Sequence, residues 1–139
     1  NNGRIIQEGS PESLYTEPRT EFAARFMGSY NVLTRPEVMT LFRGIDSLSQ
    51  SFAIRPESVL LFKLGEVHQE AVSGKNLVDG TIHSISVLGN IIRCVVDTSG
   101  IRLTIDLLND GRWLSLGDQD KVTLVLDPAQ LLHLEKEGA

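Results

Sequence analysis

The chain contains 139 residues, 41% of them hydrophobic and 22% charged, which is the normal balance of a soluble globular fold with one ordinary domain or one small domain plus an appended segment. Because 18 Asp and Glu residues outnumber 13 Lys and Arg residues, the net charge of -5 argues against a nucleic-acid partner, whose phosphates require a basic surface. No stretch approaches the roughly 20 apolar residues of a membrane-spanning helix, and a single cysteine excludes an intrachain disulfide, so we expect a cytosolic protein without membrane insertion.

The chain opens with neither an initiator methionine nor the apolar core of a signal peptide, so we expect a segment of a larger protein. Asn2-Gly3 is a turn signal that precedes a short predicted strand over residues 4–7. Ser10 as N-cap and Pro11 in the first turn then predict a short helix, which Pro18 ends.

A second helix is predicted to start at Thr20 and to stop at Gly28, because glycine readily adopts the left-handed conformation that closes a helix. Its apolar residues follow the spacing of an amphipathic stripe, which in most proteins is core. We therefore expect four side chains of this helix to be buried, namely Phe22, Ala23, Phe26 and Met27.

The pattern Arg-Pro-Glu-x-x-x-Leu-Phe occurs twice, at residues 35–42 and 55–62, but the two contexts differ. In the first copy, Thr34 and Glu37 fit a capping box, which predicts a short helix with one apolar face. That face consists of Val38, Leu41 and Phe42.

The second copy lies between two apolar runs, at residues 51–54 and 59–62, so Pro56 is expected at a bend between two strands. Eight matching positions are too few to establish a repeat. Residues 63–75 contain two glycines and several polar side chains, and we expect them to form a surface connection.

From residue 76 onward the pattern is mostly that of strands. β-Branched runs are separated by glycine-bearing turns at intervals of about ten residues, which is typical of a small antiparallel barrel or sandwich of the OB type. The predicted strands are Thr81–Val87, Ile91–Val96, Ile101–Leu107 and Val122–Leu126.

The sequence contains no set of residues that predicts catalysis. It has no phosphate-binding Gly-x-x-x-x-Gly-Lys-Ser/Thr loop, and neither His nor Cys residues recur at metal-ligand spacing. His68, His83 and His133 are isolated, and Cys94 lies in an apolar run where we expect a buried, unreactive thiol. We predict no catalytic, cofactor-binding or metal-binding residue in this chain.

Residues 1–31 carry a motif that resembles the end of the nucleotide-binding domain of ABC importer ATPases. In that group a segment N-G-x-I-x-Q-x-G-x-P-x-x-x-Y-x-x-P is followed by F-A-x-x-F-x-G-x-x-N. The positions that match, which the resemblance marks as structural or interface residues, include Gly3, Gln7, Gly9, Pro11, Tyr15, Pro18, Gly28 and Asn31.

Two later segments are similar to the transport-associated OB (TOBE) region of the same ATPases. The first is Ala53 to Glu57, with the motif residues Arg55, Pro56 and Glu57. The second runs from Gly80 through Leu88 and Gly89 to the strand at 122–126. Residues 32–50 depart from the resemblance, because they are shorter and more helical than the strand-rich stretch of the sugar-importing members.

The resemblance implies that residues 1–30 end a nucleotide-binding domain and that residues 31–139 form a mainly β, OB-like TOBE domain after a short helical segment. The parent protein is then expected to bind ATP and magnesium through motifs outside this chain and to lie against permease subunits on the cytoplasmic face of the membrane. This chain is expected to act in regulation and to form a homodimer.

Two other functions remain open from the residues alone. Some relatives of the TOBE fold bind oxyanions, and the hydroxyl donors available for this are Ser84, Ser86, Thr98 and Ser99. An OB-type nucleic-acid site would need stacking aromatics beside a basic groove, and Trp113 with Arg112 is the single candidate pair.

Overall fold

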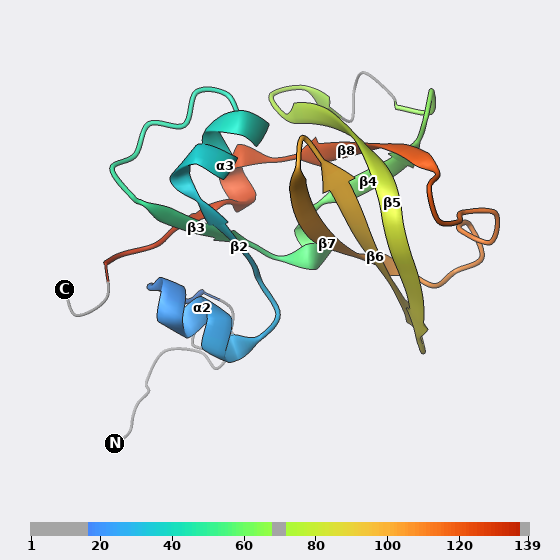
Figure 1. Cartoon of the computed structure of the whole chain (residues 1–139), viewed down its shortest axis with the longest axis horizontal. Helices are drawn as coiled ribbons and strands as arrows, with labels where there is room; N and C mark the ends of the chain where they lie inside the picture. Colours follow the sequence, from blue (N-terminus) through green and yellow to red (C-terminus); the bar gives the residue numbers. More distant parts are fainter. Residues whose placement is uncertain (1–16, 68–71, 137–139) are drawn as a thin grey trace.

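The computed structural model describes residues 17–67 and 72–136, and its strands form two antiparallel sheets (Figure 1). A three-stranded sheet has the order β2-β3-β9, with bounds Asn31–Thr34, Ser51–Ile54 and Leu132–His133. A five-stranded sheet has the order β4-β8-β5-β6-β7, with bounds Leu60–Lys63, Lys121–Leu126, Asn76–Leu88, Ile91–Thr98 and Ile101–Leu108.

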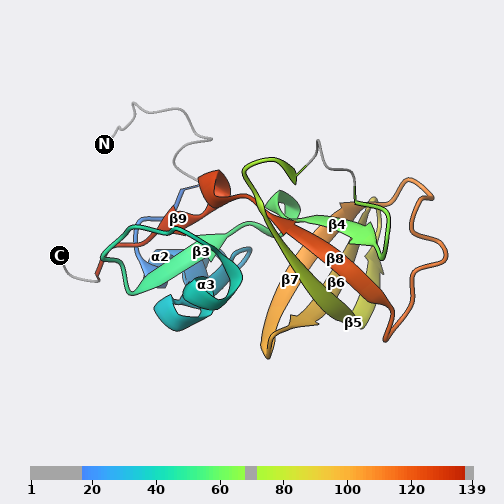
Figure 2. The same cartoon turned by 90° about the horizontal axis from the view of Figure 1, so that it is seen from above.

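The predicted mainly β, OB-like fold is confirmed. Its strands form two sheets and do not close into a barrel. All four strands predicted after residue 76 are present, although β5 begins earlier than expected, at Asn76. The five-stranded sheet is strongly curved (Figure 2). Because every neighbouring pair is antiparallel, its two edge strands, β4 and β7, run in the same direction, and they are not paired with each other.

One hydrophobic core joins the two sheets. Inward side chains alternate along β6 and β7, as the period of two in their sequence requires. Helix α3, Arg35–Leu41, and strand β3 contribute to the same cluster, so the small sheet packs as part of the molecule's main core. The cluster includes Leu33, Val38, Phe52, Ile54, Ile82, Val96, Leu103, Ile105 and Leu124.

Helix α3, Arg35–Leu41, has the predicted capping box. The Thr34 hydroxyl accepts from the Glu37 backbone N–H at 3.3 Å, and the Glu37 carboxylate accepts from the Thr34 N–H at 2.8 Å. The predicted apolar face is buried, and Val38 has no exposed surface. Pro56 also lies where it was expected, at the start of the short 3-10 turn η1, Pro56–Ser58, between β3 and β4.

Helix α2, Glu21–Met27, has the predicted ends, with Thr20 as N-cap and Gly28 at φ 77° as C-cap. The prediction of a buried aromatic stripe is wrong, since Phe22 is 67% exposed and Phe26 is 81% exposed. The helix buries its small Ala24 instead, against Ala53 of β3. A close contact of this kind leaves the two large rings outside, where they stack with centroids 6.0 Å apart.

Strands β2 and β9 were missed by the sequence patterns. Both are short, and each is held by pairing with β3, Asn31–Thr34 on one side and Leu132–His133 on the other. The short 3-10 turn η3, Pro128–Gln130, separates β8 from β9 and places the end of the described chain back on the small sheet.

Several predictions concern residues outside the described ranges. The strand at 4–7 and the helix that begins near Ser10 belong to this group, as does part of the connection at 63–75. None of the helices in residues 17–67 and 72–136 has the length and apolar character needed to cross a membrane.

Candidate functional site

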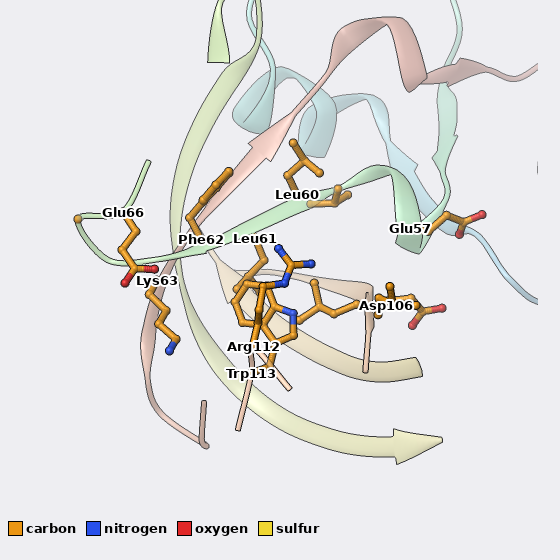
Figure 3. Close-up of a pocket in the computed structure, with 13 residues that line it drawn as sticks. Glu57, Leu60, Leu61, Phe62, Lys63, Glu66, Asp106, Arg112 and Trp113 are labelled. Atoms are coloured by element: carbon orange, nitrogen blue, oxygen red, sulfur yellow. The ribbon is translucent and has the colours of Figure 1, made fainter. Parts of the chain in front are cut away.

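A cleft of about 720 Å³ lies between the two edge strands of the five-stranded sheet (Figure 3). This volume is within the usual range of small-molecule and cofactor pockets, roughly 300 to 1,000 Å³. Residues of β4 form one wall, and the last residues of β7 form the other. The lining also includes side chains from the turns that follow each strand: Glu57, Val59, Leu60, Leu61, Phe62, Lys63, Gly65, Glu66, Asp106, Leu107, Leu108, Arg112 and Trp113.

Trp113, the chain's one tryptophan, packs against the main core from the loop after β7. The Arg112 guanidinium lies over its ring, 5.6 Å from the centroid. The indole Nε1 is buried, and among the described residues it has no hydrogen-bond partner. A buried donor without an acceptor is costly, so this part of the cleft wall carries an unfavourable group that a ligand's oxygen would relieve only if a covering side chain moved.

The two cations of the cleft have different kinds of hydrogen-bond partner. Lys63 Nζ donates to Ser115 Oγ at 2.7 Å, and Arg112 Nε pairs with Asp110 Oδ2 at 3.0 Å. The backbone N–H of Arg112 also donates to Asp110 and is the main reason that the pKa of this carboxyl lies below its usual range.

Asp106 is neutralised by Arg93, whose Nε and Nη2 donate to the two carboxylate oxygens at 2.8 and 2.9 Å. This hydrogen bonding raises the pKa of Arg93 above its ordinary value. Glu57 and Glu66 are exposed at opposite ends of the cleft, and no ion pair within the described part of the chain involves either of them. Because the Ser115 hydroxyl is neutral, the charge of Lys63 is not cancelled, and the cleft has two free carboxylates against one ammonium, an excess of negative charge.

Asn31 joins the small sheet to the free edge of β7. Its Nδ2 donates to the Thr104 carbonyl at 2.8 Å, and its Oδ1 accepts from the Thr104 N–H at 2.8 Å. The side-chain amide thus takes the place of a neighbouring strand at one position. The motif marked this residue from the sequence, but its partner is 73 positions away and could not be identified there.

The other described motif residues have structural positions apart from the cleft, with the exception of Glu57. Arg55 Nε donates to the Tyr30 hydroxyl at 3.3 Å, and Pro18 is buried. Leu88 and Gly89 form the exposed tip of the β5–β6 hairpin. The remaining motif residues lie outside the described ranges, namely Gly3, Gln7, Gly9, Pro11 and Tyr15.

Cys94 is fully buried in β6, as expected. Burial, together with a smaller contribution from the negative charge of Asp106, raises the pKa of its thiol to about 11. The thiolate required for nucleophilic chemistry therefore does not form near neutral pH.

His83 and His133 lie apart from each other. The His83 ring faces Asp97, with Nδ1 and Oδ2 3.8 Å apart, whereas His133 packs against Phe52 with ring centroids 5.1 Å apart. His68 lies outside the described residues. In residues 17–67 and 72–136, no three His, Cys, Asp or Glu side chains are grouped in a way that could hold a metal ion.

The hydroxyl donors considered for an oxyanion site do not converge. Ser84 and Ser86 lie on one face of the sheet, and Ser84 is opposite Val95 of β6. Thr98 is buried on the other face, where its hydroxyl donates to the Asp79 carbonyl at 2.8 Å. Ser99 lies in the following turn with φ 51°.

Comparison with protein families gives a match to the TOBE domain over residues 52–134. Curated relatives include the "Uncharacterized ABC transporter ATP-binding protein YdcT" of Escherichia coli, 34% identical over 100 residues that cover 72% of this chain and 26% of the relative. The spermidine/putrescine import ATP-binding protein PotA of Borrelia garinii is 25% identical over 148 residues, covering 97% of this chain and 39% of the relative.

The Fe(3+) ions import ATP-binding protein FbpC of Photobacterium profundum is 29% identical over 103 residues, covering 62% of this chain and 28% of the relative. The present chain thus matches well under half the length of these relatives. A crystal structure of the cytoplasmic molybdate-binding protein ModG superposes with a TM-score of 0.53 over 61% of each chain. At 15% sequence identity, that likeness concerns the fold alone.

Proposed function

Because this chain belongs to the TOBE domain family and matches the TOBE region of ABC importer ATP-binding proteins, we propose that it is a regulatory and dimerisation module of such an ATPase subunit. The observation that carries the proposal is the match of a TOBE fold and its flanking segment to ATP-binding proteins of importers. In this role the chain holds two ATPase subunits together and relays regulation between them while their nucleotide-binding domains open and close.

The proposal includes the rest of the parent protein. That protein hydrolyses ATP, with magnesium, in a nucleotide-binding domain, and it works with permease subunits on the cytoplasmic face of the membrane. The support for this part of the proposal is that the names of the relatives describe import ATP-binding proteins. Since the sequence contains no phosphate-binding Gly-x-x-x-x-Gly-Lys-Ser/Thr loop, the proposal assigns nucleotide chemistry to the rest of the parent protein.

The surface that we assign to dimerisation is the tip of the β5–β6 hairpin. In Figure 1 the arrowhead of β5 lies at the lower end of the five-stranded sheet. Val87 is 67% exposed and Leu88 is 49% exposed, and Leu88 pairs across the hairpin with Ile91. Burying an apolar tip of this kind against its own copy gives a self-complementary contact, as twofold symmetry requires.

Analytical ultracentrifugation of the chain over micromolar to near-millimolar concentrations tests this proposal. We expect a monomer–dimer equilibrium that Leu88→Glu weakens by about tenfold or more, because a buried carboxylate without a partner opposes association. Leu48→Glu is the matched control, since Leu48 is 94% exposed in a loop away from the hairpin. A monomer at every concentration, or equal weakening by both substitutions, would contradict the assignment.

The alternative, a sensor of small oxyanions, has less support. Its basis is the fold shared with a molybdate-binding protein. Against it, the two serines of β5 and the buried Thr98 hydroxyl lie on opposite faces of the sheet, and the Thr98 hydroxyl already donates to a carbonyl. Oxyanion sites of this kind require several donors directed at one point.

A further inference from the structure

The cleft between β4 and β7 lies where the five-stranded sheet lacks one strand between its two edges. β4 pairs only with β8 and β7 only with β6, so within the described residues each leaves one edge without a partner strand. The two edges run parallel to each other and face the same cleft. One extended segment that runs in the opposite direction would be antiparallel to both.

The two hydrogen bonds between Asn31 and Thr104 show which backbone groups of β7 point to its free edge. The N–H and C=O of Thr104 both bond to Asn31 and therefore point away from β6. Because backbone groups alternate in direction along a strand, those of Asp106 point to the same free edge. Asn31 occupies that edge at Thr104, and the part of β7 that lines the cleft begins two residues later, at Asp106.

Side chains of the cleft supply the remaining features of a peptide site. Leu60 is 42% exposed and Leu108 is 61% exposed, so each wall offers apolar surface. The buried Trp113 Nε1 is a donor that a backbone carbonyl would satisfy only if a covering side chain moved. Exposed strand edges beside apolar pockets are the usual setting of strand addition by an extended peptide.

The charges favour one class of peptide. Asp110 neutralises Arg112, whereas Lys63 donates to a neutral hydroxyl and keeps its charge. Glu57 and Glu66 are exposed at the two ends of the cleft, so two carboxylates outnumber one ammonium. An occupant with basic residues at both ends would meet both carboxylates, and an acidic one would be repelled. The net charge of -5 for the whole chain acts in the same direction.

We propose that the cleft between β4 and β7 binds an extended segment of a partner protein, with alternating apolar residues and a basic residue at each end, as an added strand. The cleft borders the hairpin tip assigned to dimerisation, because Leu108 pairs with Ile91 and Ile91 pairs with Leu88. Sedimentation is therefore needed to tell the two occupants apart. The peptide site goes beyond the proposed function by giving the module a defined place for a regulatory partner.

The test uses the full chain and the peptide acetyl-Lys-Val-Thr-Val-Thr-Val-Lys-amide as probe, with Trp113 fluorescence as the signal. Since this is the chain's one tryptophan, a saturable change reports on the cleft. We expect the probe to bind about tenfold more tightly than the same peptide with both Lys replaced by Glu. A probe with every backbone amide N-methylated should lose binding, because it cannot donate to either strand edge.

The double variant Glu57→Lys with Glu66→Lys should reverse the order of the two peptides. Asp46→Lys with Asp118→Lys makes the same change in net charge at exposed positions outside the cleft, and it should leave the order unchanged. Loss of the reversal, or equal binding of the N-methylated probe, would overturn the proposal, as would the absence of a saturable signal with any peptide.

Sedimentation of the same samples separates this result from the dimer. If the Trp113 signal changes with protein concentration alone and the probe competes with that change, a second copy occupies the cleft and the peptide proposal is wrong. If the chain stays monomeric while the probe binds, the dimer assignment fails and the strand-addition site stands.

Discussion

The Asn31 side chain replaces a neighbouring strand at one position of β7. Its amide makes both hydrogen bonds of a ladder position with Thr104, and the residue is only 8% exposed. Groups as buried as these lose water on folding, so each needs a protein partner. Asn31 therefore links the three-stranded sheet to the curved sheet through a polar contact that complements the shared core.

We predict that Asn31→Ala destabilises the chain by about 1 to 3 kcal/mol, because it leaves the N–H and C=O of Thr104 without partners. Urea unfolding followed by far-UV circular dichroism measures the change. Asn90→Ala, at an exposed turn position, is the control and should stay within about 0.5 kcal/mol of the wild type. Equal effects of the two substitutions would mean that the Asn31–Thr104 hydrogen bonds contribute nothing to the free energy of unfolding.

Strand β5 is the element on which the curved sheet is built. It runs for 13 residues and pairs with both β6 and β8, and its register with β6 shifts between Ile82 and Ser84. Near its start, Gly80 lets the backbone approach β6 closely. A Cβ at this position would lie 2.5 Å from Val96 Cγ1 and 3.1 Å from the Asp97 carbonyl oxygen.

Gly80→Ala is therefore expected to cost about 1 to 3 kcal/mol through crowding in the core. Gly117→Ala is a matched control, since a Cβ there meets no atom closer than 4.0 Å and its φ is not positive. That variant should be neutral or slightly more stable, because alanine restricts the unfolded chain. Thermal unfolding of both variants decides the point, and a neutral Gly80→Ala would show that β5 can move away from β6.

At the scale of the whole molecule, the two sheets share one hydrophobic core. Phe52 of the small sheet belongs to the same buried cluster as Ile105 and Leu124 of the large one. When two sheets share a core, unfolding one of them exposes the apolar face of the other, so the two are expected to unfold together. Helix α2, in contrast, adds only Ala24 to a separate small cluster.

A single unfolding transition is accordingly expected for both sheets. In a urea titration followed by NMR, the amide signals of Phe52 in β3 and Val96 in β6 should disappear with the same midpoint, and Trp113 fluorescence should match them. An earlier midpoint for Phe52 would show that the small sheet unfolds on its own and that the shared core does not couple the two.

Local patterns were sufficient for much of this molecule. The alternation of β6 and β7, the capping box at Thr34, the end of α2 at Gly28 and the burial of Cys94 all follow from residues within a few positions of one another. Such features depend on short-range sterics and hydrogen bonds, which a sequence carries directly.

The tertiary structure alone decided which side chains and edges remain uncovered. The pairing of Asn31 with Thr104, the short strands β2 and β9, the exposure of Phe22 and Phe26, and the cleft between β4 and β7 each depend on contacts between distant segments. A pattern along the chain can mark a side chain as apolar or a strand as present. Whether a neighbour covers it is set by sheet order and curvature, which arise only when the whole chain packs around its core.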